Sequence, residues 1–121
     1  MGDYRKLQAW ERAHRLTLEV CSATKAFPKE EMYRLTDQLC RAASSIPANI
    51  AEGCGRNGDA EFARFLDIAK GSATELDYHL ILARDLGHLP TSHYERLATE
   101  VDGVTRMISA LSAQLRKTKR S

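Results

Sequence analysis

Hydrophobic residues recur every three or four positions along most of the 121-residue chain, which is the spacing of one face of an α-helix. The last third shows this most regularly, at Tyr94, Leu97, Val101, Val104, Ile108, Leu111 and Leu115. Alternating steps of three and four form a heptad seam, the pattern of a helix that packs against other helices. Ser92 and Glu95 match a capping box, so we expect this helix to have its N-cap at Ser92.

Two further helices are predicted in the first half of the chain. The first covers residues 4–26 and ends at Phe27, because the following Pro28 breaks it. Its apolar stripe is Leu7, Trp10, Ala13, Leu16 or Thr17, Val20, and Ala23 or Thr24. The second begins with Pro28 as its first helical residue and should end at Gly53 in the left-handed conformation. Its stripe is Met32, Leu35, Leu39, Ala42, Ile46 and Ile50.

A remaining helix is predicted from an N-cap at Asp59 to Gly87. Its stripe is Phe62, Phe65, Leu66, Ala69, Ala73, Leu76, Leu80 and Ala83. Short connections make each helix antiparallel to the previous one, and no stretch has the alternation of a β-strand. We therefore predict an all-α fold, an antiparallel up-down-up-down four-helix bundle over residues 1–115, followed by a basic tail at 116–121.

Pro47 lies inside the second predicted helix and has no N–H to give to the carbonyl of Ala43. We expect a bend at this point, eased by the hydroxyls of Ser44 and Ser45.

Antiparallel pairing of the second and third helices through the loop at 53–58 predicts which residues face one another. It places Arg41 near Gly71, with Glu75 one turn further on, and the small residues 42–45 opposite Ala69, Gly71, Ser72 and Ala73. Arg41 and Glu75 would then form an ion pair beside this contact, or remain two solvated charges.

Composition limits the class of protein. Hydrophobic residues make up 43% and charged residues 28%, as in ordinary globular domains. No uncharged stretch is long enough to cross a membrane, and the charged N-terminal segment does not resemble a signal peptide, so we expect a cytoplasmic protein. All 16 acidic residues but only 14 of the 18 basic residues lie within 1–115, which gives this part a net charge of −2.

Three sequence features resemble sites of chemistry, but none has the required context. The segment Gly53–Gly58 matches the dinucleotide fingerprint G-x-G-x-x-G, yet that site needs a preceding strand and a βαβ unit. Cys54 has no evident catalytic partner, and it, Cys21 and Cys40 are expected to be reduced thiols. Glu11 and His14 have the Glu-x-x-His spacing of di-iron bundles, but no second copy exists. We expect no enzyme activity, cofactor or metal.

The basic character is concentrated in Arg116, Lys117, Lys119 and Arg120. These cations can contact nucleic-acid phosphates, or they can be a solvated helix end where positive charge suits the helix dipole.

The order and spacing of several segments resemble a known bacterial family. The segments are Phe27–Glu31, Leu35–Gln38, Arg41–Pro47, Asn49–Gly53, Phe62, Phe65–Leu66, Ala69, Gly71–Ala73, Glu75–Leu76 and Leu86–Gly87. This four-helix-bundle family includes proteins encoded within intervening sequences of large-subunit ribosomal RNA genes and is related to the accessory variability protein of diversity-generating retroelements. The resemblance implies a homopentameric ring and, in the retroelement branch, a nucleic-acid or ribonucleoprotein role. That branch is strongly basic, whereas residues 1–115 here are slightly acidic.

The polar residues of this motif are Arg41, Asn49, Glu52 and Glu75. They either line a subunit or partner interface, or satisfy backbone groups near Pro47 and the loop glycines, and we favour the structural role. The leading hypothesis is a non-enzymatic homo-oligomeric scaffold, expected to be a pentamer, that binds a protein or ribonucleoprotein partner. The alternative is a weak nucleic-acid-binding accessory protein that acts through phosphate contacts.

Overall fold

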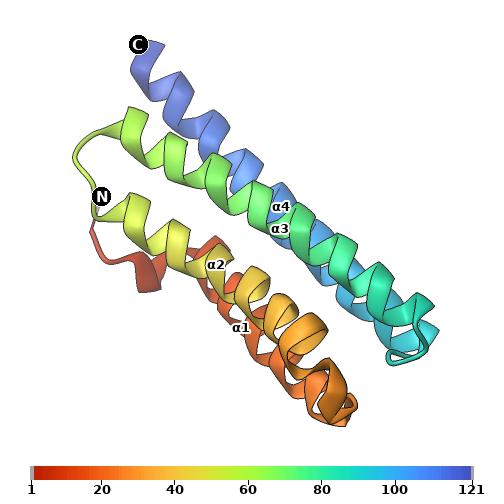
Figure 1. The fold of residues 1–121 in the computed structure, drawn as a ribbon. Helices are drawn as coiled ribbons and strands as arrows, with labels where there is room; N and C mark the ends of the chain where they lie inside the picture. Colours follow the sequence, from red (N-terminus) through yellow and green to blue (C-terminus); the bar gives the residue numbers. More distant parts are fainter. Residues whose placement is uncertain (1, 121) are drawn as a thin grey trace.

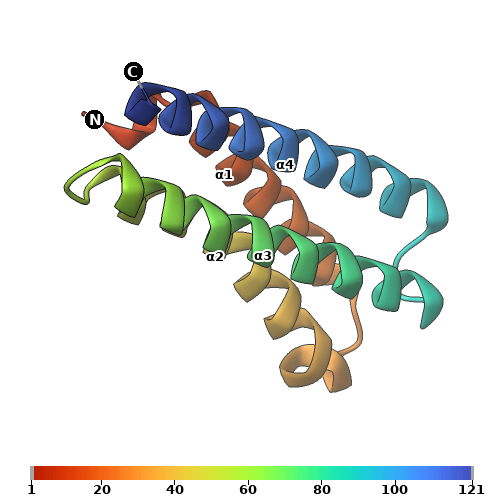
Figure 2. The ribbon, with the colours of Figure 1, turned by 90° about the horizontal axis from the view of Figure 1, so that it is seen from above.

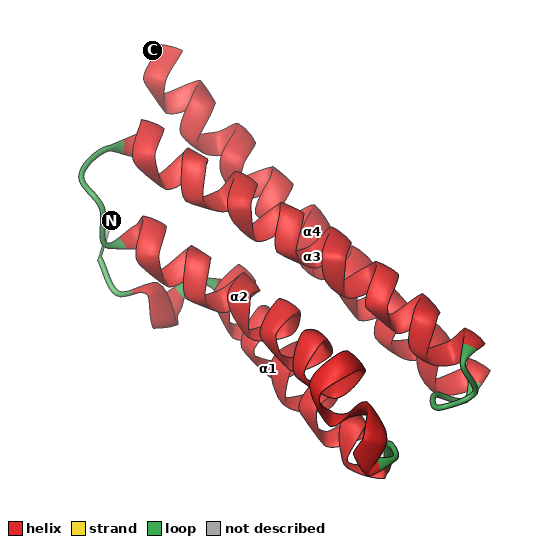
Figure 3. Cartoon of the chain, viewed as in Figure 1, coloured by secondary structure: helices red, strands yellow, loops and turns green. Residues whose placement is uncertain are grey.

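The computed structural model describes the backbone of residues 2–120 and the side chains as far as Lys117. Four long helices dominate it: α1 (Gln8–Ala23), α2 (Asp37–Cys54), α3 (Asp59–Asp85) and α4 (Thr91–Arg120). Short connections join them in an antiparallel up-down-up-down arrangement, and no strand occurs in residues 2–120 (Figures 1 and 3). The predicted all-α four-helix bundle is therefore confirmed.

Both ends of the chain lie at one end of the bundle, near the α2–α3 loop, while the α1–α2 and α3–α4 connections lie at the other end (Figures 1 and 2). No helix in the described residues has the length and apolar character needed to cross a membrane. The last helix continues through Arg120, so the backbone of the predicted tail is helical as far as that residue.

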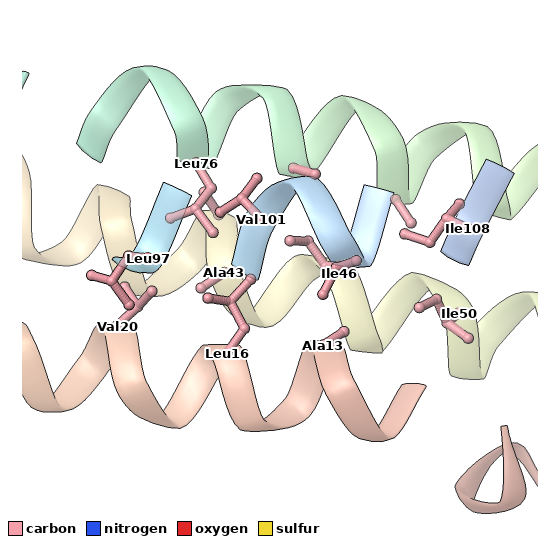
Figure 4. Packing of buried hydrophobic residues seen from close by; sticks show 14 of the residues in the cluster. Ala13, Leu16, Val20, Ala43, Ile46, Ile50, Leu76, Leu97, Val101 and Ile108 are labelled. Carbon is pink, nitrogen blue, oxygen red and sulfur yellow. The ribbon is translucent and has the colours of Figure 1, made fainter. Parts of the chain in front are cut away.

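Side chains from all four helices form one core (Figure 4). The largest fully buried members are Leu16, Leu35, Leu39, Ile46, Ile50, Leu66, Leu76, Leu80, Leu97, Ile108, Val20 and Val104. All of them belong to the predicted apolar stripes. Burying a side chain of this size contributes roughly 1.5–3 kcal/mol, so the stripes supply the main force that brings the helices together.

The start of α2 differs from the prediction. Residues Lys29–Glu31 form a 3-10 turn and Met32–Thr36 a π-helical turn, so the regular α-helix begins at Asp37 instead of Pro28. The backbone N–H of Asp37 bonds the carbonyl of Met32, five residues back. This wider turn breaks the helical register, and Met32, predicted as a core residue, is 49% exposed.

The helix ends also differ from their predicted places. The α-helix α1 spans Gln8–Ala23 instead of 4–26, with 3-10 turns at Tyr4–Lys6 and Thr24–Ala26, and the ends of α2 and α3 lie one or two residues away. Gly53 is inside α2, which ends at Cys54, and the glycines with positive φ are Gly58 (91°) and Gly87 (85°). Gly53 is needed instead for close approach, because a Cβ there would lie 2.7 Å from the Cβ of Phe65. The prediction was wrong because a glycine can either end a helix in the left-handed conformation or allow two helices to approach closely. Only the packing of the folded chain distinguishes these two roles.

The predicted N-caps were also misplaced. Asp59 is the first residue of α3, after Gly58, and makes no side-chain capping bond. The first turn of α4 is closed by a bond from the N–H of Tyr94 to the carbonyl of Pro90, which places Ser92 inside the helix. Pro90 suits the position before α4, since it lacks an N–H that would need a partner.

The carbonyl that Pro47 leaves without its usual helical donor is satisfied from another helix. The hydroxyl of Thr17 on α1 shares its proton between the carbonyl oxygen of Ala43 (3.1 Å) and that of Ala13 in its own helix (2.9 Å). The predicted role of Ser44 and Ser45 was wrong: Ser44 bonds the carbonyl of Arg41, and Ser45 bonds Ser72. The helix α2 runs on through Pro47 to Cys54.

Candidate interaction surface

An exposed face formed by α2 and α3 brings the motif residues together. We define this α2–α3 face by Arg41, Ser45, Ala48, Asn49 and Glu52 on α2 and by Ile68, Gly71, Ser72 and Glu75 on α3. Their spacing of three and four places each set on one side of its helix. Every member is exposed or half-buried, so the face consists of small and polar side chains interrupted by Ile68, whose exposure is 41%.

Hydrogen bonds hold the middle of this face. The side-chain amide of Asn49 donates to the carbonyl of Ser45 (2.8 Å) and to its hydroxyl (3.0 Å). The Ser45 hydroxyl in turn lies 2.9 Å from that of Ser72, which links α2 to α3. Asn49 is therefore hydrogen-bonded to the serine pair that links the two helices.

The Ser45–Ser72 contact sets a different register from the predicted one. In an antiparallel pair this contact places Arg41 level with residue 76, about one turn from the predicted neighbour Gly71. Ser45 and Ser72 do face one another as predicted, whereas a Cβ added to Gly71 would meet nothing within 4 Å. A further close approach of α2 and α3 occurs at Gly53.

The charged members of the face do not pair across it. Arg41 pairs with Asp37 (2.9 Å) and Glu52 with Arg56 (3.1 Å), each one turn away on or beside α2. Glu75 makes no ion pair with any described side chain. The predicted Arg41–Glu75 pair was wrong, and the alternative of two solvated charges holds: the Arg41 side chain is 79% exposed.

The basic end of α4 lies at the end of the bundle that carries the α2–α3 loop, beside the start of α3 (Figure 1). Arg116 lies 3.8 Å from Asp67 on α3, and Lys117 is exposed. The side chains of Lys119 and Arg120 lie outside the described residues. Two of the four predicted phosphate-contacting cations are thus placed on the surface, and one of these has an acidic neighbour.

The features that resembled sites of chemistry have other contacts. Glu11 pairs with Arg15, and the ring of His14 stacks on Trp10 at a centroid distance of 5.0 Å. Cys54 is buried, with its Sγ 3.4 Å from the carbonyl oxygen of Gly2. Among the described residues, no three His, Cys, Asp or Glu side chains converge in a way that would hold a metal ion.

A polar cluster at the far end of the bundle was not found from the sequence. Glu31 is buried, and its carboxylate accepts hydrogen bonds from Arg34 (2.7 Å) and His88 (2.8 Å). The Arg34 bond, followed by the His88 bond, lowers the pKa of Glu31 below its usual range despite opposition from burial. Since Glu31 and His88 are 57 positions apart, no local pattern pointed to their contact.

A Schellman motif at the end of α3 positions His88 in this cluster. The N–H of His88 bonds the carbonyl of Ala83, and the N–H of Gly87 bonds that of Arg84, with Gly87 in the left-handed conformation. The His88 ring also packs at 5.8 Å from that of Phe27. The cluster therefore ties the α1–α2 connection to the α3–α4 connection.

The seam between α1 and α4 is the most open side of the bundle. A groove of about 600 Å³ lies at its end and is lined mainly by small and apolar side chains, including Leu18 and Leu89. Two ion pairs cross the seam, Arg96–Glu19 (2.6 Å) and Arg12–Glu100 (3.2 Å). The charged lining residues Glu19 and Arg96 thus pair with each other within the chain.

Comparisons with known proteins agree with this architecture. A family model described as 23S rRNA-intervening sequence protein matches residues 5–110. A solved structure of a protein of unknown function from the S23 ribosomal protein family of Bacteroides thetaiotaomicron superposes with a TM-score of 0.80 at 20% sequence identity. That similarity covers 86% of this chain and 97% of the other. No match was found among curated proteins.

Proposed function

We propose that this chain, which belongs to the 23S rRNA-intervening sequence protein family, is a non-enzymatic scaffold that assembles with copies of itself and binds a protein or ribonucleoprotein partner. The expected assembly is a homopentameric ring, as the family resemblance implies. The observation that carries the proposal is the α2–α3 face, where apolar groups and a carboxylate without an ion-pair partner are exposed on two rigid helices.

The shape of this face suits a helix from another copy. Gly71 has open space around it, and Ala48 and the serines carry short side chains, so a neighbouring helix can approach closely. Ile68 is 41% exposed, and Tyr78, which follows one turn after Glu75, is 58% exposed. Aromatic and apolar side chains of this kind supply much of the binding energy at protein interfaces.

Charge favours a contact between different surfaces of two copies. Glu75 has no ion-pair partner among the described side chains, while Arg41 on the neighbouring helix is 79% exposed. A head-to-tail contact can place the Glu75 carboxylate of one copy against a cation of the next, and repeated contacts of this kind form a ring when the rotation between neighbouring copies closes. An ion pair of this kind contributes more to the selection of the correct partner than to the affinity of the contact.

Assembly is tested by sedimentation equilibrium and light scattering at micromolar concentration, with Ile68→Glu as the disruptive variant. Leu18→Glu is the matched control, because Leu18 is also exposed (57%) but lies on α1 beside the α1–α4 groove. We expect the wild type and Leu18→Glu to be oligomers and Ile68→Glu to be a monomer with unchanged helicity. A monomeric wild type would overturn the proposal. Equal dissociation of both variants would show that the loss of assembly is not specific to the α2–α3 face.

The second candidate function is weak nucleic-acid binding by the end of α4. The observation in its favour is the end of α4, which carries the exposed cations Arg116 and Lys117 beside the first turns of α3. Residues 1–115 have a net charge of −2, so any phosphate contacts should depend on this end.

The nucleic-acid role is tested by fluorescence anisotropy with RNA and DNA oligonucleotides, using the intact protein and a version that ends at Leu115. Binding by the intact protein should weaken steeply with salt, because each phosphate contact releases counterions, and should be lost in the shortened version. No binding, or binding that salt leaves unchanged, would exclude phosphate contacts as its basis.

A further inference from the structure

Two cysteines from neighbouring helices meet at the end of the α1–α2 hairpin. Thr24 follows the last turn of α1, and its hydroxyl donates a hydrogen bond to the backbone carbonyl of Cys21 (2.8 Å). The same hydroxyl oxygen lies 3.7 Å from the Sγ of Cys40 on α2. The Cys40 thiol therefore lies against the turn of α1 that carries Cys21.

The environment of the pair differs from that of the third cysteine. Cys21 and Cys40 are both half-buried, so a small reagent can reach them from solvent. Burial, followed by interaction with the Cys40 thiol, raises the pKa of Cys21 to about 11, which keeps this thiol protonated and slow to react at neutral pH. Cys54 is buried at the opposite end of the bundle, beside Gly2.

We propose that Cys21 and Cys40 are a dithiol site that a low-molecular-weight disulfide, such as glutathione disulfide, oxidises to a disulfide bond between α1 and α2. The thiolate of one cysteine attacks a sulfur of glutathione disulfide, forms a mixed disulfide and releases one glutathione thiolate. The thiolate of the second cysteine attacks the protein sulfur of the mixed disulfide and releases the second glutathione. Two electrons and two protons pass from the cysteine pair to the two glutathione molecules.

The backbone between the two cysteines can accommodate this bond. It contains 3-10 turns at Thr24–Ala26 and Lys29–Glu31 and the π-helical turn at Met32–Thr36, where hydrogen bonding is less regular than in an α-helix. This irregular segment leads directly into the first turn of α2, which carries Cys40. The bond would close this connection covalently and restrict the unfolded chain. This inference does not depend on self-assembly.

The test incubates the intact protein with glutathione disulfide, quenches with acid, and counts free thiols under denaturing conditions. The count should fall from three to one, and the intact mass should fall by that of two hydrogen atoms. Trypsin should release peptides 16–25 and 35–41 as a linked pair under non-reducing conditions, with Cys54 unmodified in peptide 42–56. Oxidation should also raise the urea concentration at which the protein unfolds.

Three variants serve as controls. Cys54→Ser should oxidise like the wild type, whereas Cys21→Ser and Cys40→Ser should form only a glutathione adduct on the remaining cysteine of the pair. The main measurement uses the wild type, so it holds even if a variant folds poorly. Three unchanged thiols, modification confined to Cys54, or a bond between two chains on a non-reducing gel would each overturn the proposal.

Discussion

The hydroxyl of Thr17 lies 3.1 Å from the carbonyl oxygen of Ala43, and this contact joins α1 to α2 at the level of Pro47. A proline inside a helix normally costs about 3 kcal/mol, part of which is the carbonyl left without a donor four residues earlier. A donor from the next helix reduces that cost. It also makes the packing of α1 on α2 depend on a specific polar contact.

Replacement of Thr17 by valine should therefore destabilise the protein. Valine has the same shape but no hydroxyl, so the carbonyl of Ala43 loses its donor from α1, at a cost of about 1 kcal/mol. The free energy of unfolding, measured by urea denaturation, should fall by this amount. Thr17→Ser is the control, because it keeps the hydroxyl.

A double-mutant cycle with Pro47→Ala tests the cause. Alanine at position 47 restores an N–H that can bond Ala43 within α2, so the loss from Thr17→Val should be smaller in that background. An equal loss in both backgrounds would show that the Thr17 hydroxyl does not act through the carbonyl freed by Pro47.

Addition of a methyl group at Gly53 should destabilise the α2–α3 contact. A Cβ there would lie 2.7 Å from the Cβ of Phe65 and 3.0 Å from Cδ1 of Phe62, and such overpacking costs about 1–3 kcal/mol. Gly55→Ala is the control, since an added Cβ there makes only ordinary contacts of 3.6 and 3.7 Å and φ is −85°, so stability should stay the same or rise by up to about 1 kcal/mol. Thermal unfolding at equal protein concentration distinguishes the two, and a stabilising Gly53→Ala would contradict the packing argument.

Gly103 provides a second case in which a glycine makes room for a neighbour. An added Cβ would overlap the guanidinium of Arg12, which lies against α4 and pairs with Glu100. Gly103→Ala should displace this guanidinium and weaken the ion pair across the α1–α4 seam. The pair is partly exposed, so the loss should be no more than about 1 kcal/mol. In an Arg12→Ala background the same substitution should stabilise the protein by about 0.5–1 kcal/mol, because alanine favours a helix over glycine, as urea denaturation of the two pairs of proteins would reveal.

Stability should depend on pH through Glu31. Its pKa is lowered in the folded protein, first by Arg34 and also by His88, so the carboxylate contributes stability above its usual value of 4.5. That contribution is lost as the pH falls from 4.5 through the lower folded pKa. Glu31→Gln should therefore be less stable than wild type at pH 7, and the difference should shrink at pH 3.

The urea midpoints of wild type and variant from pH 7 to pH 3 measure this effect. Glu30→Gln is the neighbouring control, since the Glu30 side chain is exposed, and it should shift the midpoints little. A difference between wild type and Glu31→Gln that stays constant with pH would show that the carboxylate acts by shape and not by charge.

The contrast between α2 and α4 shows why some elements were predictable. The heptad stripe of α4 is uninterrupted, and its predicted core positions Leu97, Val104 and Ile108 are fully buried. At the start of α2 the same kind of stripe failed at Met32, because the π-helical turn rotates the residues before Asp37 relative to those after it. An insertion of this type leaves no clear mark in a pattern of apolar residues.

The candidate surface was predictable in composition but not in pairing. The exposed positions of Arg41, Glu52 and Glu75 follow from their spacing along the two helices, since such spacing is a local property. The ion pairs of Arg41 and Glu52 are also local, since each joins residues four positions apart. The contacts between α2 and α3 were not predictable, because a register difference of about one turn exchanges every partner across a helix pair. The Ser45–Ser72 contact decides that register.

By itself, the sequence determined that this protein has four amphipathic helices, short antiparallel connections and one apolar core, because helical periodicity and chain breaks act over a few residues. The tertiary structure alone decided that Thr17 bonds the carbonyl of Ala43, that Gly53 and not Gly71 lies at a close approach, and that Glu31 meets His88. These contacts join residues far apart in the chain. They depend on how the four helices shift and rotate against one another until their side chains pack, a property of the whole assembly of helices and of no single segment.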